Sequence, residues 1–336
     1  MKTHVITAIV CAITIMSGTA TAKSANDTPP GATWCSLCTS VPDMRPVNVE
    51  IVKRLAYTDH TLEDSYDYNG ITREFQWDRI RQTLVELEYG QRNPSDLWVT
   101  LQNYKNKNGT APLTTSHGRD AYNTDTDSHG TSRTQAVPLY SADNFSIPTR
   151  YGRDGTLFRY LKDTAGYVKI CSMIYDGSWY VPEKYVKKLS TNRFDKVIFV
   201  DRTNQNIATL EKGEDDIWYV LSMNPATTGL HNPPYQQETP LGTYVVQEHK
   251  PKMYYLKDGS SAIAGFAPWA SRFTRGAYIH GVPLNNPDAT QKDYIEFTWT
   301  LGTTPRSHMC VRNATSHAKY IYDWATPLES LVVVIE

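Results

Sequence analysis

The sequence predicts a mainly β protein with some α-helix, on three observations. Tyrosine and tryptophan are abundant, at 22 and 8 of 336 residues, and aromatic side chains are enriched in strands. Short apolar runs separated by Gly, Pro and Asn recur along the chain, which is the pattern of strands and turns. Helical spacing of apolar residues is clear in two segments, one in each half of the chain.

Residues 1–22 have the features of a secretion signal. Lys2 precedes an apolar run, and Ala20-Thr21-Ala22 supplies small residues at a cleavage site. No later segment reaches the roughly 18 apolar residues of a transmembrane helix. We therefore expect an exported protein without a transmembrane segment. Because the sequence also lacks a sortase signal, we expect it in the periplasm or cell envelope.

The charge balance excludes some partners. The chain has 34 Lys and Arg against 35 Asp and Glu, and removal of the signal leaves 33 against 35. A near-neutral chain without a basic stretch does not fit nucleic acid or anionic lipid.

Four cysteines remain once Cys11 leaves with the signal. In an oxidising compartment Cys35 and Cys38, in TWCSLC, are expected to form a local disulfide. Cys171 lies in the alternating run YVKICSMIY and is expected to be a buried structural thiol. Cys310 is then the cysteine that needs a chemical explanation.

Residues 23–133 are expected to form a mixed region that contains a helix at 72–89, in TREFQWDRIRQTLVELEYG. Its apolar side chains fall on one face and are expected to pack in a core; they are Trp77, Ile80, Leu84 and Leu87, with Gly90 closing the helix. Residues 106–133 read as loop.

Residues 134–192 carry brief strands split by turns, which predicts a small barrel. The strands are expected in VPLYS, TLFRYL, GYVKICSMIY and SWYVPEKYV. The ending DGSWYVPEKYVKKL resembles the close of a bacterial SH3-like domain, and this resemblance implies a module that accompanies cell-wall enzymes and contacts peptidoglycan.

Residues 193–336 are again rich in strands, which predicts a β-sandwich or irregular barrel. The runs are KVIFVD, IWYVLSM, GTYVVQ, YIEFTWT and LVVVIE. A second helix is expected in ATSHAKYIYDWA, beginning near Thr315, and SHMC at 307–310 precedes it.

Histidines near Cys310 in sequence or in the expected sheet suggest a nucleophilic thiol. A free thiol has a pKa of about 8.5, so a nucleophilic cysteine needs a neighbouring base or a helix N-terminus. His308 lies two residues away, and His280 reaches the thiol if two strands pair. The carbonyl of Gly281 is placed to hold the other imidazole nitrogen and fix its tautomer.

Four segments in order resemble the YkuD-type L,D-transpeptidase catalytic domain. They are TPLGTYVV, IHG, SHMCVRN and the terminal LVVVIE, and KVIFVDRTNQNIATLEKG is similar to the family's first hairpin. The resemblance implies Cys310 as nucleophile, His280 as general base oriented by Gly281, and His308 as a residue that shapes the pocket. It also implies an oxyanion hole from the N–H groups of Met309 and Cys310, with Arg312 and Ser307 binding substrate.

The family's reaction needs no metal or organic cofactor. Cys310 would form a thioester with a peptidoglycan stem tetrapeptide, releasing D-Ala, and an amine of another stem would resolve it. This chemistry serves cell-wall biogenesis and cell shape.

Two alternative functions stay open for the same resemblance: an L,D-carboxypeptidase or endopeptidase on the same fold, and a non-catalytic peptidoglycan-binding scaffold. The second is raised by Met309, which stands where the family has glycine and demands a backbone without positive φ, or strain. A zinc site of His280, His308, Cys310 and His317 is a further alternative.

Overall fold

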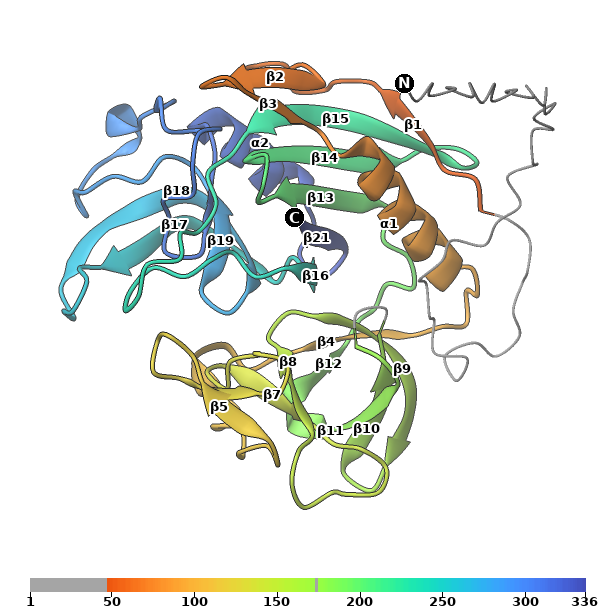
Figure 1. Ribbon diagram of the computed structural model, residues 1–336. Helices are drawn as coiled ribbons and strands as arrows, with labels where there is room; N and C mark the ends of the chain where they lie inside the picture. The colour runs from red at the N-terminus through yellow and green to blue at the C-terminus, as the bar shows by residue number, and fades with distance from the viewer. Residues whose placement is uncertain (1–46, 173–174) are drawn as a thin grey trace, which may run out of the picture. The chain divides into compact units, whose positions relative to one another are not determined.

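The computed structural model describes residues 47–172 and 175–336 and is mainly β, as the sequence predicts (Figure 1). Three sheets of four or more strands contain most of the strand residues of the described chain. The smaller elements are the hairpins β2 (Ser65–Tyr68) with β3 (Ile71–Glu74), β5 (His117–Arg119) with β6 (Asp125–Asp127), and β7 (Ala136–Leu139) with β8 (Arg150–Arg153), and 3-10 turns at Tyr104–Asn106, Glu183–Tyr185 and Gln291–Asp293.

The six-stranded sheet is the centre of the carboxy-terminal half. Its strand order is β1 (Glu50–Lys53), β15 (Ile217–Pro225), β14 (Asn206–Lys212), β13 (Lys196–Asp201), β21 (Ser330–Ile335) and β16 (Gly242–Val245). β13, β14 and β15 form an antiparallel meander, and the last strand of the chain, β21, runs parallel to β13. Both faces of this sheet are buried, so its strands read as nearly continuous apolar runs.

Helix α1 (Trp77–Gly90) packs against one face of the six-stranded sheet. Ile80, Leu84 and Leu87 share a core cluster with Val197 and Phe199 of β13. The apolar stripe predicted for this helix is therefore core, as expected. Because β1 also pairs with β15, the first described segment is built into the same sheet as the carboxy-terminal strands.

The predicted start of this helix, at residue 72, is wrong. Residues 71–74 form β3, which pairs with β2 across a turn at Asn69 and Gly70. Both turn residues have positive φ, 53° and 75°, as a two-residue hairpin turn of the Asn-Gly type requires. That dipeptide was a hairpin signal in the sequence, and the helix begins only after it.

The other face of the six-stranded sheet packs against a second sheet and a helix. This four-stranded sheet has the order β17 (Glu248–Leu256), β18 (Ile263–Thr274), β19 (Ala277–His280) and β20 (Val311–Arg312). Ile198 and Val200, the alternate residues of β13, share a cluster with Ile279 of β19 and Ile321 of α2 (Thr315–Trp324). The arrangement is a β-sandwich, and the helix predicted to begin near Thr315 is confirmed.

Residues predicted to form a small barrel form an open sheet instead. Its order is β11 (Ser178–Pro182), β10 (Tyr167–Cys171), β9 (Leu157–Thr164), β4 (Trp98–Leu101) and β12 (Val186–Lys188). Its edge strands β11 and β12 are not paired with each other, and no sheet of the described residues closes into a barrel. β4 comes from before residue 134, so this sheet draws on chain that the sequence places in the preceding region. The SH3-like character of this part stays a prediction.

The strand predicted in YIEFTWT is wrong. Residues 294–298 have no regular secondary structure, and the apolar side chains of the alternating run face solvent: Ile295, Phe297 and Trp299 are 46%, 39% and 74% exposed. The backbone is tied to the start of α2, where Thr315 donates to the carbonyls of Ile295 and Glu296. Alternation here reflects an exposed strap, not a half-buried strand.

Several expectations fall on residues that the structure does not describe. The signal at 1–22 and the disulfide between Cys35 and Cys38 lie outside the described residues. Cys171 is buried as expected, but it takes part in a disulfide bond, so the prediction of a free thiol there is wrong. A buried free cysteine and a buried disulfide-bonded cysteine are both flanked by apolar residues, so the run around Cys171 does not distinguish them.

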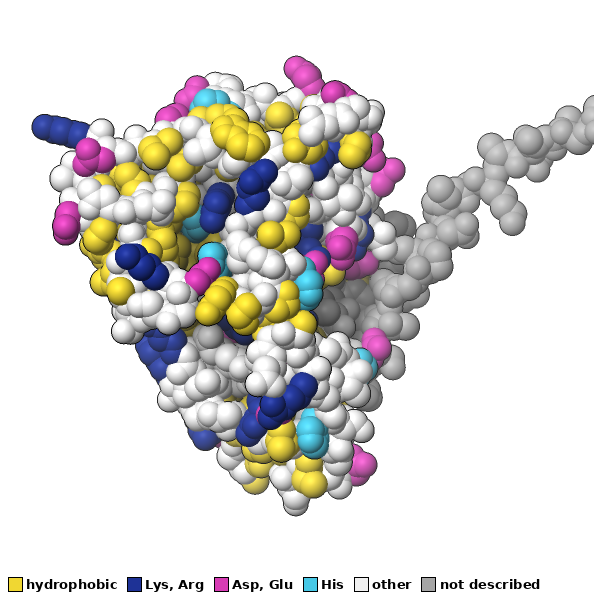
Figure 2. All heavy atoms as spheres, turned by 60° about the vertical axis from the view of Figure 1, so that its left-hand side comes forward, with side chains coloured by type: hydrophobic (Ala, Val, Ile, Leu, Met, Phe, Trp, Pro, Cys, Tyr) yellow, Lys and Arg dark blue, Asp and Glu magenta, His cyan; other side chains and the backbone are white. Residues whose placement is uncertain are grey.

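The distribution of charged side chains on the surface agrees with the near-neutral charge of the sequence. On the face shown in Figure 2, basic and acidic side chains are interspersed, and hydrophobic side chains form several separate groups. None of the helices in the described part of the chain has the length and apolar composition needed to cross a bilayer.

Candidate active site

The backbone of the SHMC segment is clamped between two other segments. On one side, Thr227 exchanges two backbone hydrogen bonds with Arg312, each 2.9 Å, and Leu230 donates to the carbonyl of Ser307. On the other side, Gln237 donates to the carbonyl of His308 at 3.1 Å. The position of Cys310 is therefore set by hydrogen bonds from residues about 70 to 85 positions earlier in the chain.

Gly229 and Thr239 explain how these segments approach so closely. A Cβ at Gly229 would lie 2.1 Å from the Gln237 carbonyl oxygen and 2.9 Å from the Met309 Cα, so only glycine fits. The Thr239 hydroxyl accepts from the Gly229 N–H at 2.9 Å and donates to the Met309 carbonyl at 2.8 Å. The TPLG part of the sequence thus braces the cysteine segment.

Strand register brings His280 and Cys310 to one face of the four-stranded sheet. β19 and β20 are parallel, with Ile279 opposite Val311 and His280 opposite Arg312. Side chains alternate along strands, so His280 and Arg312 share a face. Cys310 lies just before β20 and shares an apolar cluster with Tyr278, which is two residues before His280 in β19 and therefore on the same face.

The Cys310 thiol is held in its neutral form. The residue is 9% exposed and shares an apolar cluster with Tyr278 and Ala270. Its Sγ donates to the carbonyl of Gly276 at 3.6 Å. Burial raises the pKa of the thiol to about 11, against the opposing effects of the Tyr278 backbone N–H and the Arg312 guanidinium.

His280 is also neutral, and its tautomer follows from its partner. Its Nδ1 lies 2.6 Å from the Gly281 carbonyl oxygen. A carbonyl oxygen only accepts, so Nδ1 carries the proton and Nε2 keeps its lone pair. Burial lowers the pKa of His280 to about 4; the Gly281 hydrogen bond opposes this and Arg312 reinforces it. The site therefore presents a neutral thiol and a neutral imidazole whose Nε2 can accept a proton.

Gly281 is required by the helix that follows. A Cβ there would lie 2.8 Å from Thr315 Oγ1, 3.0 Å from Pro268 Cγ and 3.1 Å from Thr315 Cα. The Thr315 hydroxyl also accepts from the Val282 N–H at 3.0 Å. The first turn of α2 therefore presses on the peptide whose carbonyl orients His280.

Met309 adopts an ordinary backbone conformation. It is not among the described residues with positive φ, so the expected alternative of strain does not arise. Its N–H points at the Ser307 hydroxyl at 3.3 Å, and that hydroxyl donates to the Cys310 carbonyl. Ser307 is 1% exposed and braces the backbone of its own segment.

The remaining candidate ligands of a zinc site have separate partners. His308 is half exposed and its Nε2 pairs with Asp258, at 2.8 Å, in the turn between β17 and β18. His317 is buried between Asn313 and Ser222. Within the described ranges no group of three or more His, Cys, Asp or Glu side chains has the arrangement of a metal site.

Two contacts of the thiol were not foreseen. The acceptor Gly276 lies in the turn between β18 and β19, and Tyr278 lies against the sulfur. Tyr278 has a signal in the sequence, since it alternates with His280 along a predicted pairing. Gly276 has no such signal, because every residue has a backbone carbonyl and the residue type does not show which carbonyl accepts a hydrogen bond.

Comparison with known proteins identifies this domain. Residues 195–335 match the family model of the YkuD L,D-transpeptidase catalytic domain. A search of curated proteins found no match. Similar solved structures include a fused Zn-dependent amidase/peptidase/peptidoglycan-binding domain-containing protein of Clostridium acetobutylicum. The two sequences are 19% identical, the match covers 44% of this chain and 55% of that chain, and the TM-score is 0.30.

Two further structures are L,D-transpeptidases. That of Mycobacterium smegmatis has 16% identity over 52% of this chain and 80% of its own, with TM-score 0.34. That of Mycobacterium tuberculosis has 20% identity over 55% of this chain and 73% of its own, with TM-score 0.31. The match to the Clostridium chain spans little more than half of that chain's length. By its match to the family model, the carboxy-terminal part of the chain, residues 195–335, is an L,D-transpeptidase catalytic domain of the YkuD family.

Proposed function

We propose that the protein is a cell-wall L,D-transpeptidase that forms or remodels peptidoglycan cross-links through a thioester at Cys310. The observation that carries the proposal is the Gly281 carbonyl, which fixes the proton of His280 on Nδ1 and leaves Nε2 as the base on the face that presents the thiol. The assignment of residues 195–335 to the family supports it.

The proposed reaction starts from a neutral Cys310 thiol and a neutral His280 imidazole. As Sγ attacks the carbonyl carbon of the third stem residue, its proton passes to His280 Nε2 and the carbonyl oxygen becomes an oxyanion. The C–N bond to D-Ala then breaks, and His280 returns the proton to the leaving amine. An acceptor amine attacks the thioester, its proton passes to His280, and the thiol is regenerated. The N–H of Cys310 is proposed to stabilise the oxyanion, and the N–H of Met309 joins it by leaving the Ser307 hydroxyl to which it donates in this structure.

Arg312 is proposed to bind the carboxylate of the stem peptide. It shares the sheet face of His280 and Cys310, and its Nε is buried without a hydrogen-bond partner among the described residues. Its guanidinium lowers the thiol pKa, and burial lowers its own. A carboxylate satisfies such a donor with a bidentate pair. Ser307 contributes by keeping the cysteine backbone in place, and His308 by linking this segment to the β17–β18 turn.

The hydrolase alternative shares the acyl-enzyme and differs in the nucleophile that resolves it. The scaffold alternative rests on Met309, whose ordinary backbone conformation removes the possibility of strain; the muropeptide experiment below separates this alternative from the enzyme. We further propose that the protein acts in the periplasm or cell envelope after export, and that the open sheet, as an SH3-like module, contacts peptidoglycan.

Incubation of the purified protein with tetrapeptide muropeptides, read by mass spectrometry, tests the proposal. New dimers with release of D-Ala are expected; shortened stems without dimers would assign the hydrolase, and unchanged substrate the scaffold. Cys310→Ala and His280→Ala are expected to abolish turnover. His129→Ala, at an exposed position outside residues 195–335, is the matched control and is expected to keep turnover.

A further inference from the structure

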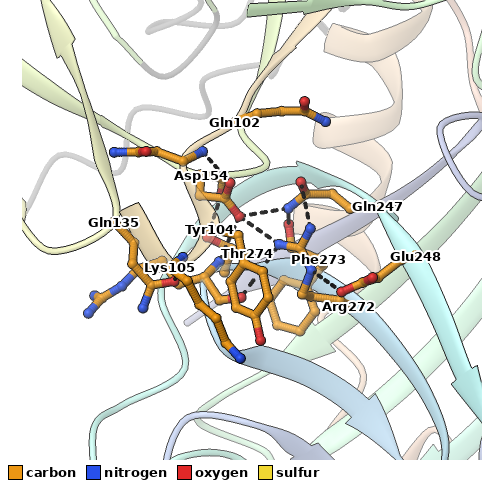
Figure 3. Close-up of polar contacts among 12 residues, drawn as sticks. Gln102, Tyr104, Lys105, Gln135, Asp154, Gln247, Glu248, Arg272, Phe273 and Thr274 are labelled. Carbon is orange, nitrogen blue, oxygen red and sulfur yellow. Dashed lines mark hydrogen bonds and ion pairs between the residues drawn. The ribbon is translucent and has the colours of Figure 1, made fainter. Parts of the chain in front are cut away.

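A buried carboxylate from the turn that leads into the open sheet lies at the centre of a polar network in the catalytic domain (Figure 3). Asp154, in the turn between β8 and β9, is fully buried. Its Oδ2 accepts from Arg272 Nη1 at 2.8 Å, from Gln247 Nε2 at 2.9 Å and from the Arg275 backbone N–H at 3.0 Å. Its Oδ1 accepts from the Asn103 N–H at 2.7 Å. A buried charge with this many donors is fully satisfied.

The same residue holds the β18–β19 turn by a second contact. The Thr274 hydroxyl donates to the Asp154 carbonyl oxygen at 2.5 Å. Arg275, next in the turn, has a φ of 44°, in the region that L residues rarely adopt. Asp154 therefore holds Thr274, the last residue of β18, and Arg275, the first residue of a turn whose conformation needs outside support.

Gly155 lets the carboxylate come this close. It has a φ of 81°, and a Cβ there would lie 1.9 Å from the Phe273 carbonyl oxygen. Its own carbonyl accepts from the Val245 N–H at 2.9 Å. The β8–β9 turn thus joins β16 and β18 of the catalytic domain through backbone contacts.

The residue after Arg275 is Gly276, whose carbonyl accepts the Cys310 thiol. Asp154 and the Cys310 sulfur are therefore linked through the β18–β19 turn by two hydrogen bonds, one from the Arg275 N–H to Asp154 and one from the thiol to the Gly276 carbonyl. A second path reaches the same side of the thiol: Tyr104, also from outside the catalytic domain, stacks under Arg272 at 4.3 Å and lies 3.4 Å from the Tyr278 hydroxyl.

We infer that Asp154 is a positioning residue for Cys310: by fixing the β18–β19 turn, it aims the Gly276 carbonyl at the thiol and holds the sulfur in place for attack. The open sheet is then part of the machinery of the catalytic domain and not only an appended module. The inference rests on the proposed function for its turnover readout but not for its reactivity readout.

The test follows the reactivity of one sulfur in the full chain. Alkylation of Cys310 by iodoacetamide is measured between about pH 6 and pH 10 by mass spectrometry of the peptide that contains it. The variants are Asp154→Asn, which replaces an acceptor by a donor facing Arg272, and Thr274→Val, which removes one hydroxyl with little change of shape. Arg312, His280 and Tyr278, the ionisable groups that face the thiol, stay unchanged in both.

Release of the turn removes the acceptor of the S–H group and admits water, so the thiol pKa is expected to fall toward its ordinary value of about 8.5. Alkylation near pH 7 should rise by roughly 10-fold or more in Asp154→Asn and by less in Thr274→Val, while transpeptidation falls in the same order. Unfolding would also raise alkylation and lower turnover, because it exposes the buried thiol, so the comparison uses only variants whose circular dichroism spectrum and cooperative thermal transition match those of the wild type.

Asp163→Asn is the matched control, because it breaks an exposed pair with Lys188 in the same sheet and should leave both readouts unchanged. An alkylation profile of folded Asp154→Asn or Thr274→Val that equals the wild-type profile overturns the inference. If Asp154→Asn does not fold, Thr274→Val decides. If the wild type shows no transpeptidation but the alkylation profile shifts as expected, the proposed function fails and the inference stands.

Discussion

Replacing Gly281 by alanine tests the geometry of the base most directly. The new Cβ would lie 2.8 Å from Thr315 Oγ1, 3.0 Å from Pro268 Cγ and 3.1 Å from Thr315 Cα, whereas carbon atoms pack at about 3.5–4.0 Å. The strand and the first turn of α2 must therefore separate by roughly 0.5–1 Å. The Gly281 carbonyl moves with them, away from its 2.6 Å contact with His280 Nδ1.

Two effects of this substitution are expected. Overpacking of this kind costs about 1–3 kcal/mol, and each kcal/mol corresponds to roughly 2–4 °C of Tm in a domain of 150–250 residues. Misplacement of the base by this distance lowers the rate of thioester formation by up to about 10²-fold. Differential scanning calorimetry and intact-protein mass spectrometry of the acyl-enzyme measure the two effects separately.

Gly118→Ala is the control for this experiment, since a Cβ there makes only an ordinary 3.6 Å contact with Thr126. It is expected to change neither Tm nor rate. A Gly281→Ala protein that loses stability as expected but acylates at the wild-type rate would show that the carbonyl does not orient His280, and the reasoning on the tautomer would be refuted.

Three further outcomes are expected. Stability should fall as pH drops below about 6.5, because the unfolded chain protonates His280 and His317 while burial lowers their folded pKa to about 4 and about 3; each adds a slope of about 1.4 kcal/mol per pH unit. His317→Gln should remove about half of that slope in urea titrations between about pH 6 and pH 4.5, and an unchanged slope would contradict the assignment. Stability should also fall as pH rises from about 9 to about 11, where the unfolded chain loses the Cys310 proton first; Cys310→Ala should remove about 1.4 kcal/mol per pH unit of this fall, and buried tyrosines with raised pKa, such as Tyr66 and Tyr244, supply the rest. Leu84→Ala, at a fully buried position of α1, should cost about 2–5 kcal/mol in a single unfolding transition shared with the catalytic domain; two transitions would show that α1 is not part of that core.

Local pattern was sufficient for much of the fold. The runs KVIFVD and LVVVIE are strands because their β-branched residues suit a sheet buried on both faces, and the stripe of α1 is core because its spacing matches the helix period. Errors arose where one pattern serves two structures. The alternation of Ile295, Phe297 and Trp299 looks like a strand but lies in an exposed strap tied to α2.

The sequence by itself determined which residue types carry the proposed chemistry and their order along the chain: a histidine followed by glycine, then a cysteine in a Ser-His segment, within a β-rich domain that the family model matches. Only the tertiary structure decided the protonation of the thiol and imidazole and the partners that hold them. The physical reason is distance along the chain. Burial sets these pKa values through side chains from several strands, and the thiol is aimed by a carbonyl 34 residues away, in a turn held by the carboxylate of Asp154. The residue types alone do not show which backbone carbonyl accepts a hydrogen bond or which side chain is removed from water.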